Sequence, residues 1–254
     1  MTNKRKLIML ILILAGAVLL QTNTQAAPNI PIPSIGLDME PAETPEDVAL
    51  SLQILFLLTI LSLAPAILIM TTSFTRIIIV LSFIRNALAT QQTPPNQVLI
   101  GLALFLTLFV MSPVISEVNQ EAYSPYMEGE IVFEEALERA IQPLRQFMFR
   151  QTRQKDLALF VNISGQEGVN DINEITSRAL IPAFIISELK TAFQMGFLLF
   201  VPFLVIDMVV ASTLMSMGMM MLPPIMVSLP FKILLFIMVD GWNLVVQSLV
   251  MGFR

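Results

Sequence analysis

The stretch Leu214-Met-Ser-Met-Gly-Met-Met-Met-Leu-Pro-Pro-Ile-Met-Val-Ser-Leu-Pro-Phe-Lys232 separates two long apolar segments. It contains six of the chain's seventeen methionines. Its prolines, Pro223, Pro224 and Pro230, exclude one uninterrupted helix, since proline lacks an N–H and restricts the residue before it. We therefore expect the apolar tip of a helical hairpin here.

Two interpretations of these methionines are open. Methionine is unbranched and polarizable, so a ring of such loops could close around a narrow passage and yield when something passes. The other interpretation is a methionine-rich turn inside a core, which composition alone favours because methionine fills irregular cores generally.

The overall composition is typical of a membrane protein. Of 254 residues, 56% are hydrophobic and 13% charged, with a mean hydropathy of +0.78, whereas soluble domains carry about 25% charged residues. The net charge of −5 gives no sign of the basic surface that nucleic-acid-binding proteins present. With no Cys and no His, disulfides and Cys/His metal sites are excluded, and so is the commonest general base. We expect no enzyme activity, no cofactor and no metal.

The amino terminus has the three parts of a secretory signal peptide. Lys4, Arg5 and Lys6 precede the apolar run 7–20, and small residues follow at 24–26. We predict cleavage after Ala26; an uncleaved first anchor is the alternative. Residues 27–47 then form an acidic, proline-rich tail that we expect to be extended.

Two apolar regions flank a polar one. Residues 48–116 and 179–254 are predicted to form helical hairpins, the second carrying the methionine-rich loop, with four spans in all. Positive-inside bias, read from Arg76, Arg85 and Lys232, places the loop on the cytoplasmic side. The mature amino end and residues 117–178 then lie on the periplasmic side.

Residues 117–178 are predicted to form an extramembrane helical subdomain. Apolar residues recur at helical spacing over 131–149, which predicts an amphipathic helix, and a shorter helix is expected around 156–161. The apolar face, including Phe147 and Phe160, needs a partner. Either neighbouring subunits or the subdomain's own helices can supply it, and both alternatives stay open.

Several charges lie in apolar surroundings and are predicted to face protein or water, because a charge at the bilayer centre costs roughly 2.5–3.5 kcal/mol. Glu188 and Lys190 are two residues apart, so they point to different faces and are expected to pair across subunit interfaces. The others are Arg76, Arg85, Asp207 and Asp240.

Two motifs carry a family resemblance. They are Pro-Ala-Phe-Ile-Ile-Ser-Glu-Leu-Lys-Thr-Ala-Phe-Gln-Met-Gly-Phe at 182–197 and Leu-Pro-Phe-Lys-Ile-Leu-Leu-Phe-Ile-Met-Val-Asp-Gly-Trp at 229–242. From about residue 48 onward the chain resembles the FliP (SctR-like) family, the P subunit of the flagellar type III secretion export gate.

The resemblance implies an all-α chain whose apolar hairpins assemble, largely above the inner membrane, into a closed helical gate in the flagellar basal body. The implied partners are further copies of the chain, the Q and R subunits, other export apparatus proteins, the membrane, and unfolded flagellar substrates in transit. It also implies that the methionine-rich loop forms a gasket, a role that maps onto Met217, Gly218, Met219, Met220 and Met221.

An ion-coupled secondary transporter that uses Asp207 or Asp240 is the alternative function. Transporters usually contain internal repeats with sites near the bilayer midplane, and the two halves of this chain show no convincing repeat. An intramembrane enzyme lacks any nucleophile–base constellation.

Overall fold

The computed structural model describes residues 45–90, 92–165, 175–219 and 221–253, and every regular element in them is a helix. The chain is therefore all-α, as predicted. The signal peptide at 1–26, nearly all of the acidic tail and Met220 lie outside the described residues. The elements are α2 (Pro45–Thr71), α3 (Phe74–Ala87), α4 (Asn96–Val118), the π-helical turn η1 (Asn119–Tyr123), α5 (Ser124–Met127), α6 (Phe133–Gln151), α7 (Gln154–Ile163), α8 (Ser177–Ser216), α9 (Pro224–Met238) and α10 (Gly241–Met251).

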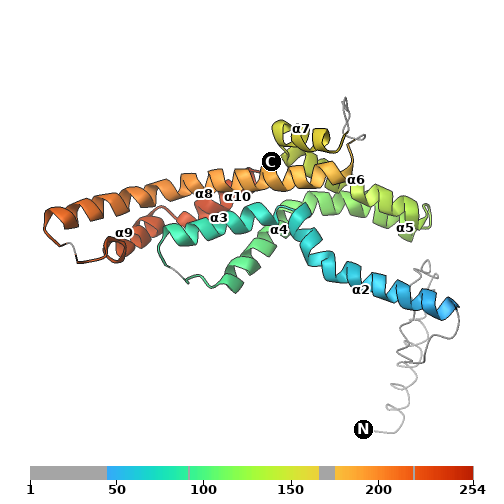
Figure 1. Ribbon diagram of the computed structural model, residues 1–254, viewed down its shortest axis with the longest axis horizontal. Coiled ribbons are helices and arrows are strands. Elements are labelled where there is room, and N and C mark those ends of the chain that lie inside the picture. The colour runs from blue at the N-terminus through green and yellow to red at the C-terminus, as the bar shows by residue number, and fades with distance from the viewer. Residues whose placement is uncertain (1–44, 91, 166–174, 220, 254) are drawn as a thin grey trace, which may run out of the picture.

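The main core is built on α3. Ile77, Val80, Leu81 and Ile84 are each exposed by 1% or less, and their spacing of three or four residues places them on one face of the helix. This face packs along α8 and against α4 (Figure 1). Full burial of such a side chain contributes about 1.5–3 kcal/mol, so these four residues anchor α3 against α8 and α4.

A glycine sets how closely α3 and α8 approach. A Cβ added to Gly196 of α8 would lie 2.5 Å from Cγ of Phe83 on α3, well inside van der Waals contact. Phe83 also packs edge-to-face against Phe193, with ring centroids 5.4 Å apart. The absence of a side chain at Gly196 therefore makes room for an aromatic ring between the two helices.

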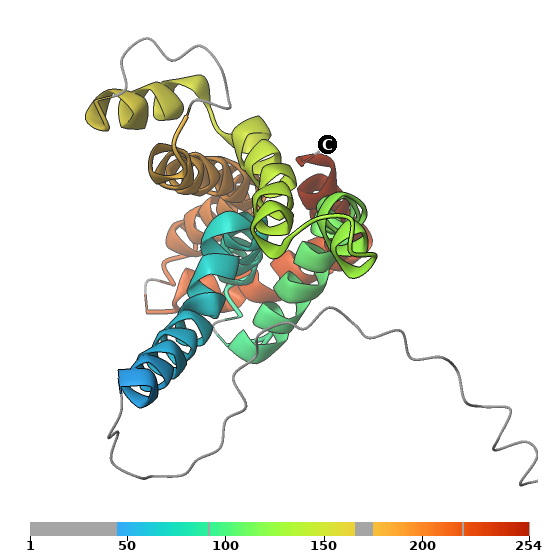
Figure 2. The same cartoon turned by 90° about the vertical axis from the view of Figure 1, so that its right-hand side faces the viewer.

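A second core is separate from the first. It joins residues of α4, α6 and α8, namely Met111, Val114, Phe147, Met148, Ala179, Leu180 and Phe184, together with Ile175. The amphipathic helix predicted over 131–149 is α6, and the shorter one expected around 156–161 is α7. Figure 2 shows α7 at the periphery, beside α8.

The apolar segments are only partly covered. Only 6% of the most apolar stretch of α2 is buried. This helix projects away from the others (Figures 1 and 2). Three helical stretches are long and apolar enough to cross a membrane: Val48–Thr71, Asn96–Met127 and Ser177–Ser216. The 40 residues of α8 extend about 60 Å, which is twice the roughly 30 Å hydrocarbon core. α8 is therefore longer than a single perpendicular crossing requires.

The fourth expected span is not one straight helix. α9 and α10 are bent by 64° relative to each other, and Asp240 between them adopts a left-handed conformation with φ 50°. The Asp240-Gly241 pair is a turn signal in the sequence, and a Cβ on Gly241 would lie 2.2 Å from the Phe236 ring. The turn interrupts the last apolar stretch, and α9 and α10 together still pass as one broken span.

The close approach at Gly196 yields a stability prediction. Gly196→Ala should destabilise the chain by about 1–3 kcal/mol, because the added methyl group overpacks the α3–α8 contact. Thermal unfolding of the purified full-length chain measures the change.

Gly101→Ala on α4 is the matched control, because no atom lies within 4 Å of its added Cβ. Alanine exceeds glycine in helix propensity by about 0.8–1 kcal/mol, so this variant should be as stable as the wild type or slightly more so. Equal unfolding midpoints for the two variants would contradict the packing role of Gly196.

Candidate functional site

The methionine loop connects α8 to α9 and begins with a Schellman closure. Gly218 has φ 76°, a conformation that glycine adopts at no steric cost. Its N–H donates to the Met215 carbonyl at 3.0 Å, and the N–H of Met219 donates to the Leu214 carbonyl at 3.0 Å. These two bonds satisfy carbonyls that the end of α8 would otherwise leave unpaired. The loop therefore leaves the helix in one defined direction.

Prolines fix the other end of the loop. Pro223 precedes α9 and Pro224 is its first residue, where the missing N–H costs no hydrogen bond. The sequence correctly predicted an interruption here, although Pro230 lies inside α9 and does not end it.

The tip between these two ends is apolar and uncovered in the single chain. Met217 is 72% exposed and Met221 100% exposed, with Met219 at 40%. The described methionines of the loop therefore do not form a core turn within this chain. On soluble proteins, contiguous exposed apolar surface of this kind marks a site of contact with another protein or with a membrane.

A buried ion pair behind the tip joins the two arms of the hairpin. The Lys232 ammonium of α9 lies 2.6 Å from Oδ2 of Asp207 on α8, and the Ser228 hydroxyl donates to Oδ1 of Asp207 at 2.6 Å. The Lys232 side chain is 2% exposed and that of Asp207 29%. At 1.5 Å per residue these contacts lie about 12–14 Å from the helix ends that flank the loop. The pair therefore fixes α9 against α8 just below the tip.

Sequence reasoning placed Asp207 in protein but missed its partner. Asp207 and Lys232 lie at nearly equal sequence distances, 13 and 12 residues, from position 220, the centre of the loop 217–223 between α8 and α9. Two positions so related face each other across the arms of a helical hairpin, which is the signal that could have found the pair.

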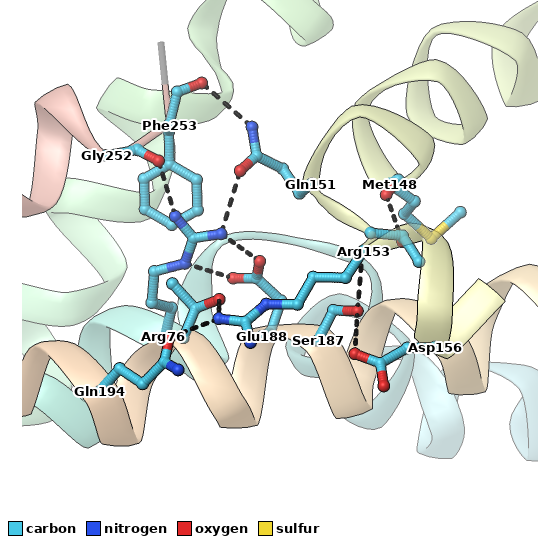
Figure 3. A network of polar contacts seen from close by, with 12 residues as sticks. Arg76, Met148, Gln151, Arg153, Asp156, Ser187, Glu188, Gln194, Gly252 and Phe253 are labelled. Atoms are coloured by element: carbon cyan, nitrogen blue, oxygen red, sulfur yellow. Dashed lines mark hydrogen bonds and ion pairs between the residues drawn. The ribbon is translucent and has the colours of Figure 1, made fainter.

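A second buried network holds the bundle together (Figure 3). The Arg76 guanidinium of α3 binds both carboxylate oxygens of Glu188 on α8, with Nε donating to Oε2 at 2.8 Å. It also donates to the Gly252 carbonyl at 2.8 Å and to Oε1 of Gln151 at 3.0 Å. Such a two-pronged contact uses the fixed fork of the guanidinium. One arginine thus ties α3, α6, α8 and the segment after α10.

Phe253 completes this network. Its ring lies 3.9 Å from the Arg76 guanidinium carbon, a cation–π geometry. It also stacks on Phe147, with centroids 6.3 Å apart, and its carbonyl accepts a hydrogen bond from Gln151 Nε2 at 3.1 Å. The end of the chain is therefore held against α3 and α6.

These contacts correct the expected subunit-interface residues. Glu188 is fully buried and pairs with Arg76 inside the chain, so it needs no ion-pair partner from a neighbouring subunit. Phe147 is 5% exposed and lies in the second core, while Phe160 packs partly buried against it. Self-packing of the helices, the alternative left open by the sequence, accounts for both phenylalanines.

The remaining charges divide between buried and exposed positions. Arg76 is 2% exposed, in agreement with a buried charge. Arg85 is only partly buried and donates to the Asn96 side chain. Asp240 is exposed in the single chain and accepts a hydrogen bond from Asn243. The turn between α9 and α10 carries it to the surface of the single chain, and its burial in an assembly stays a prediction.

α7 docks on α8 through a polar contact (Figure 3). Asp156 is 3% exposed; it pairs with Lys190 and accepts a hydrogen bond from the Ser187 hydroxyl at 2.9 Å. The Arg153 backbone N–H donates to the same Ser187 oxygen at 3.0 Å. Lys190 therefore has its partner within the chain, contrary to the expectation of an interface pair.

The hydrogen bond from Lys190 holds the pKa of Asp156 below its usual range, although burial acts in the opposite direction. Ser187 lowers the pKa further. A carboxyl group whose pKa is lowered on folding stabilises the folded state above its ordinary pKa of about 3.9. That stabilisation is lost as the pH falls through the lowered value.

Removing Glu188 tests the buried network. Glu188→Ala leaves the Arg76 charge buried without its partner and should destabilise the isolated chain by about 3–5 kcal/mol. Thermal unfolding of the purified single chain measures this loss. Glu135→Ala, which removes an exposed partner of Arg139, should cost less than about 1 kcal/mol. A normal single chain combined with a lost assembly would instead return Glu188 to an interface.

The contact between α7 and α8 predicts a pH dependence. The stability difference between the wild type and Asp156→Asn should be largest above about pH 5 and shrink as the pH falls below about 4. Unfolding measured across this range provides the test. In a Lys190→Met background the difference should change much less with pH, and an unaltered dependence would show that Lys190 is not the cause.

Comparison with known proteins identifies the family. The FliP family matches residues 57–249. The flagellar biosynthetic protein FliP of Bacillus subtilis is 60% identical over 209 residues, which cover 82% of this chain and 95% of the relative. The protein of the same name from Pectobacterium carotovorum is 57% identical over 204 residues, 80% of this chain and 79% of the relative. That from Aquifex aeolicus is 52% identical over 206 residues, 80% of this chain and 86% of the relative. The chain belongs to the FliP family.

Proposed function

We propose that this chain is a non-enzymatic core subunit of the flagellar protein export gate, in which several copies surround the path of unfolded flagellar proteins and help to seal it. Membership of the FliP family gives a role in flagellar export. The observation that carries the sealing role is the uncovered methionine tip on a fixed hairpin.

The tip combines a defined backbone with adaptable side chains. The Schellman closure at Gly218 and the pair of Pro223 and Pro224 hold its two ends. Its exposed thioethers keep their rotamer freedom, and methionine repacks at little cost. Several such tips meeting at an axis would close a passage without a rigid plug, which is what a seal around a chain of varying side chains requires.

Assembly is supported by the apolar surface that one chain leaves uncovered. On α8 alone, Phe197 is 63% exposed, Leu198 70% and Met208 63%. Lipid cannot cover all of an α8 that is about 60 Å long. We therefore assign part of this surface to further copies of the chain and to the Q and R subunits, with other export apparatus proteins around them.

The location follows from the same reasoning. The apolar helices suit the bacterial inner membrane. A subunit of the export gate would lie there within the flagellar basal body. The periplasmic placement of residues 117–178 rests on the signal peptide, because Arg76 and Lys232 are buried in ion pairs and are not free loop charges of the kind that the positive-inside rule counts. A methionine loop on the cytoplasmic side would then close the entrance of the passage.

The seal is tested by changing Met219, Met220 and Met221 together. Replacement of all three by Ala should leave the complex assembled but make the membrane leaky to small ions, since the shorter side chains leave gaps. Replacement by Leu should keep the seal, because swaps that roughly conserve volume usually cost less than about 1.5 kcal/mol. Export is expected to slow, as the branched side chain adapts less easily. Ion flux and flagellin secretion are measured in cells that carry each variant.

Met238→Ala is the matched control, because this methionine is exposed but lies outside the loop. It should cause no leak. A triple Ala variant that assembles normally and stays as tight as the wild type would rule out the loop as the seal.

A further inference from the structure

Four methionines lie within five consecutive residues of the methionine loop, at positions 217 and 219–221. Met217 is 72% exposed, Met219 40% and Met221 100%. An exposed thioether is open to small oxidants, whereas one in a close-packed core is shielded by its neighbours. The described thioethers of the loop can therefore be reached from the solvent by a molecule as small as hydrogen peroxide.

Methionine is the only sulfur-containing side chain that an oxidant meets in this protein. Cysteine and methionine are the side chains that peroxide oxidises in steps that cells can reverse, and the chain contains no cysteine. Its methionines differ widely in exposure. Met111 is 4% and Met148 3% exposed, both in the second core, so they share the chemistry of the loop methionines but not their accessibility.

The oxidation itself needs no catalytic group of the protein. The sulfur lone pair attacks one oxygen of hydrogen peroxide, so that an S–O bond forms while the O–O bond breaks. The proton on the transferred oxygen passes to the departing hydroxide, which leaves as water. Sulfur is oxidised and the peroxide is reduced, and the product is methionine sulfoxide, a polar side chain in place of an apolar one.

The surroundings of the loop offer a sulfoxide oxygen little besides water. Residues 208–231 contain no charged side chain. The Ser216 and Thr213 hydroxyls at the end of α8 already donate to the Thr213 and Val209 carbonyls, at 2.9 and 3.1 Å. A polar group that is buried without a hydrogen-bond partner is destabilising. A sulfoxide at the tip therefore stays hydrated, and its water prevents close apolar contact between neighbouring tips.

We propose that the methionine loop is a site of reversible oxidation, at which sulfoxide formation opens the seal and reduction closes it again. This inference rests on the sealing role proposed above and assigns a regulation to the same loop. Water fills the passage beside the seal, so dissolved peroxide reaches the tips in the assembled gate as well. The adaptable thioether that suits a seal is thus also the group that makes the seal sensitive to oxidants.

The test uses the assembled complex that contains the full-length chain, reconstituted in lipid vesicles and treated with hydrogen peroxide. Peptide mass spectrometry follows the oxygen gained at each methionine, and the ion leak is recorded in parallel. Met217, Met219 and Met221 should be oxidised at least about tenfold faster than Met111 and Met148, because oxidation follows exposure. The leak should rise with oxidation of the loop. It should return to its starting level after treatment with methionine sulfoxide reductases for both sulfoxide epimers.

Replacement of Met217, Met219, Met220 and Met221 by Leu removes the oxidisable sulfurs and keeps apolar side chains in the loop. Each variant is compared with itself before and after peroxide, so any difference in resting leak does not enter. Peroxide should leave the leak of this Leu variant unchanged. Met238→Leu removes an exposed methionine outside the loop and should respond to peroxide as the wild type does.

Three outcomes would overturn the inference. They are an equal rise of the leak in the Leu variant, an oxidised loop without a rise in the leak, and oxidation of the loop no faster than that of the buried methionines. Failure of the sealing role gives a different result, since the triple Ala variant would then stay tight without any oxidant. A leaking triple Ala variant beside an oxidised wild type that stays tight would reject the oxidation site alone.

Discussion

The buried contact between Arg76 and Glu188 is the interaction on which the arrangement of the helices depends. The Glu188 side chain is fully buried and that of Arg76 is 3% exposed, so neither charge is hydrated. Desolvation of this kind costs several kcal/mol per ion and is compensated only by near-ideal geometry and further hydrogen bonds. The two-pronged pairing, the Gln151 amide, the Gly252 carbonyl and the Phe253 ring supply them. Because these groups come from four separate parts of the chain, the charge is tolerated only when all of them are in place.

The same logic explains why charges can be paired between the helices while apolar side chains also cover much of the outer surface. Lys232 is matched by Asp207, and Asp156 by Lys190 and Ser187, while α2 and much of α8 present apolar side chains outwards. Hydropathy counts residue types along the chain and does not register which side of a helix they occupy. Paired charges inside the bundle therefore leave the apolar signal of a span intact, even in α8, whose length exceeds the thickness of the hydrocarbon.

The sequence predicted what depends on neighbours along the chain. Local periodicity identified α6, and the glycine and prolines marked both ends of the methionine loop. Arg76 and Glu188 lie 112 residues apart, and no local pattern relates them, so Glu188 was assigned to an interface. Asp240 lies within an apolar run whose composition does not reveal the turn; the Asp240-Gly241 pair is the signal for it. The interface assignments that failed all depended on tertiary partners.

In the proposed gate, the division between a fixed frame and a mobile tip determines how the passage opens. Separating α9 from α8 would remove Asp207 from Lys232, whose side chain is 2% exposed. Breaking such a buried ion pair costs about 3–5 kcal/mol. Exposed side chains change rotamer in picoseconds to nanoseconds, whereas collective helix motions take microseconds or longer. A passage sealed by methionine side chains on an immobile hairpin can therefore widen around a translocating chain without unfolding its frame. It also closes again as soon as the chain has left, because no backbone hydrogen bond has to re-form.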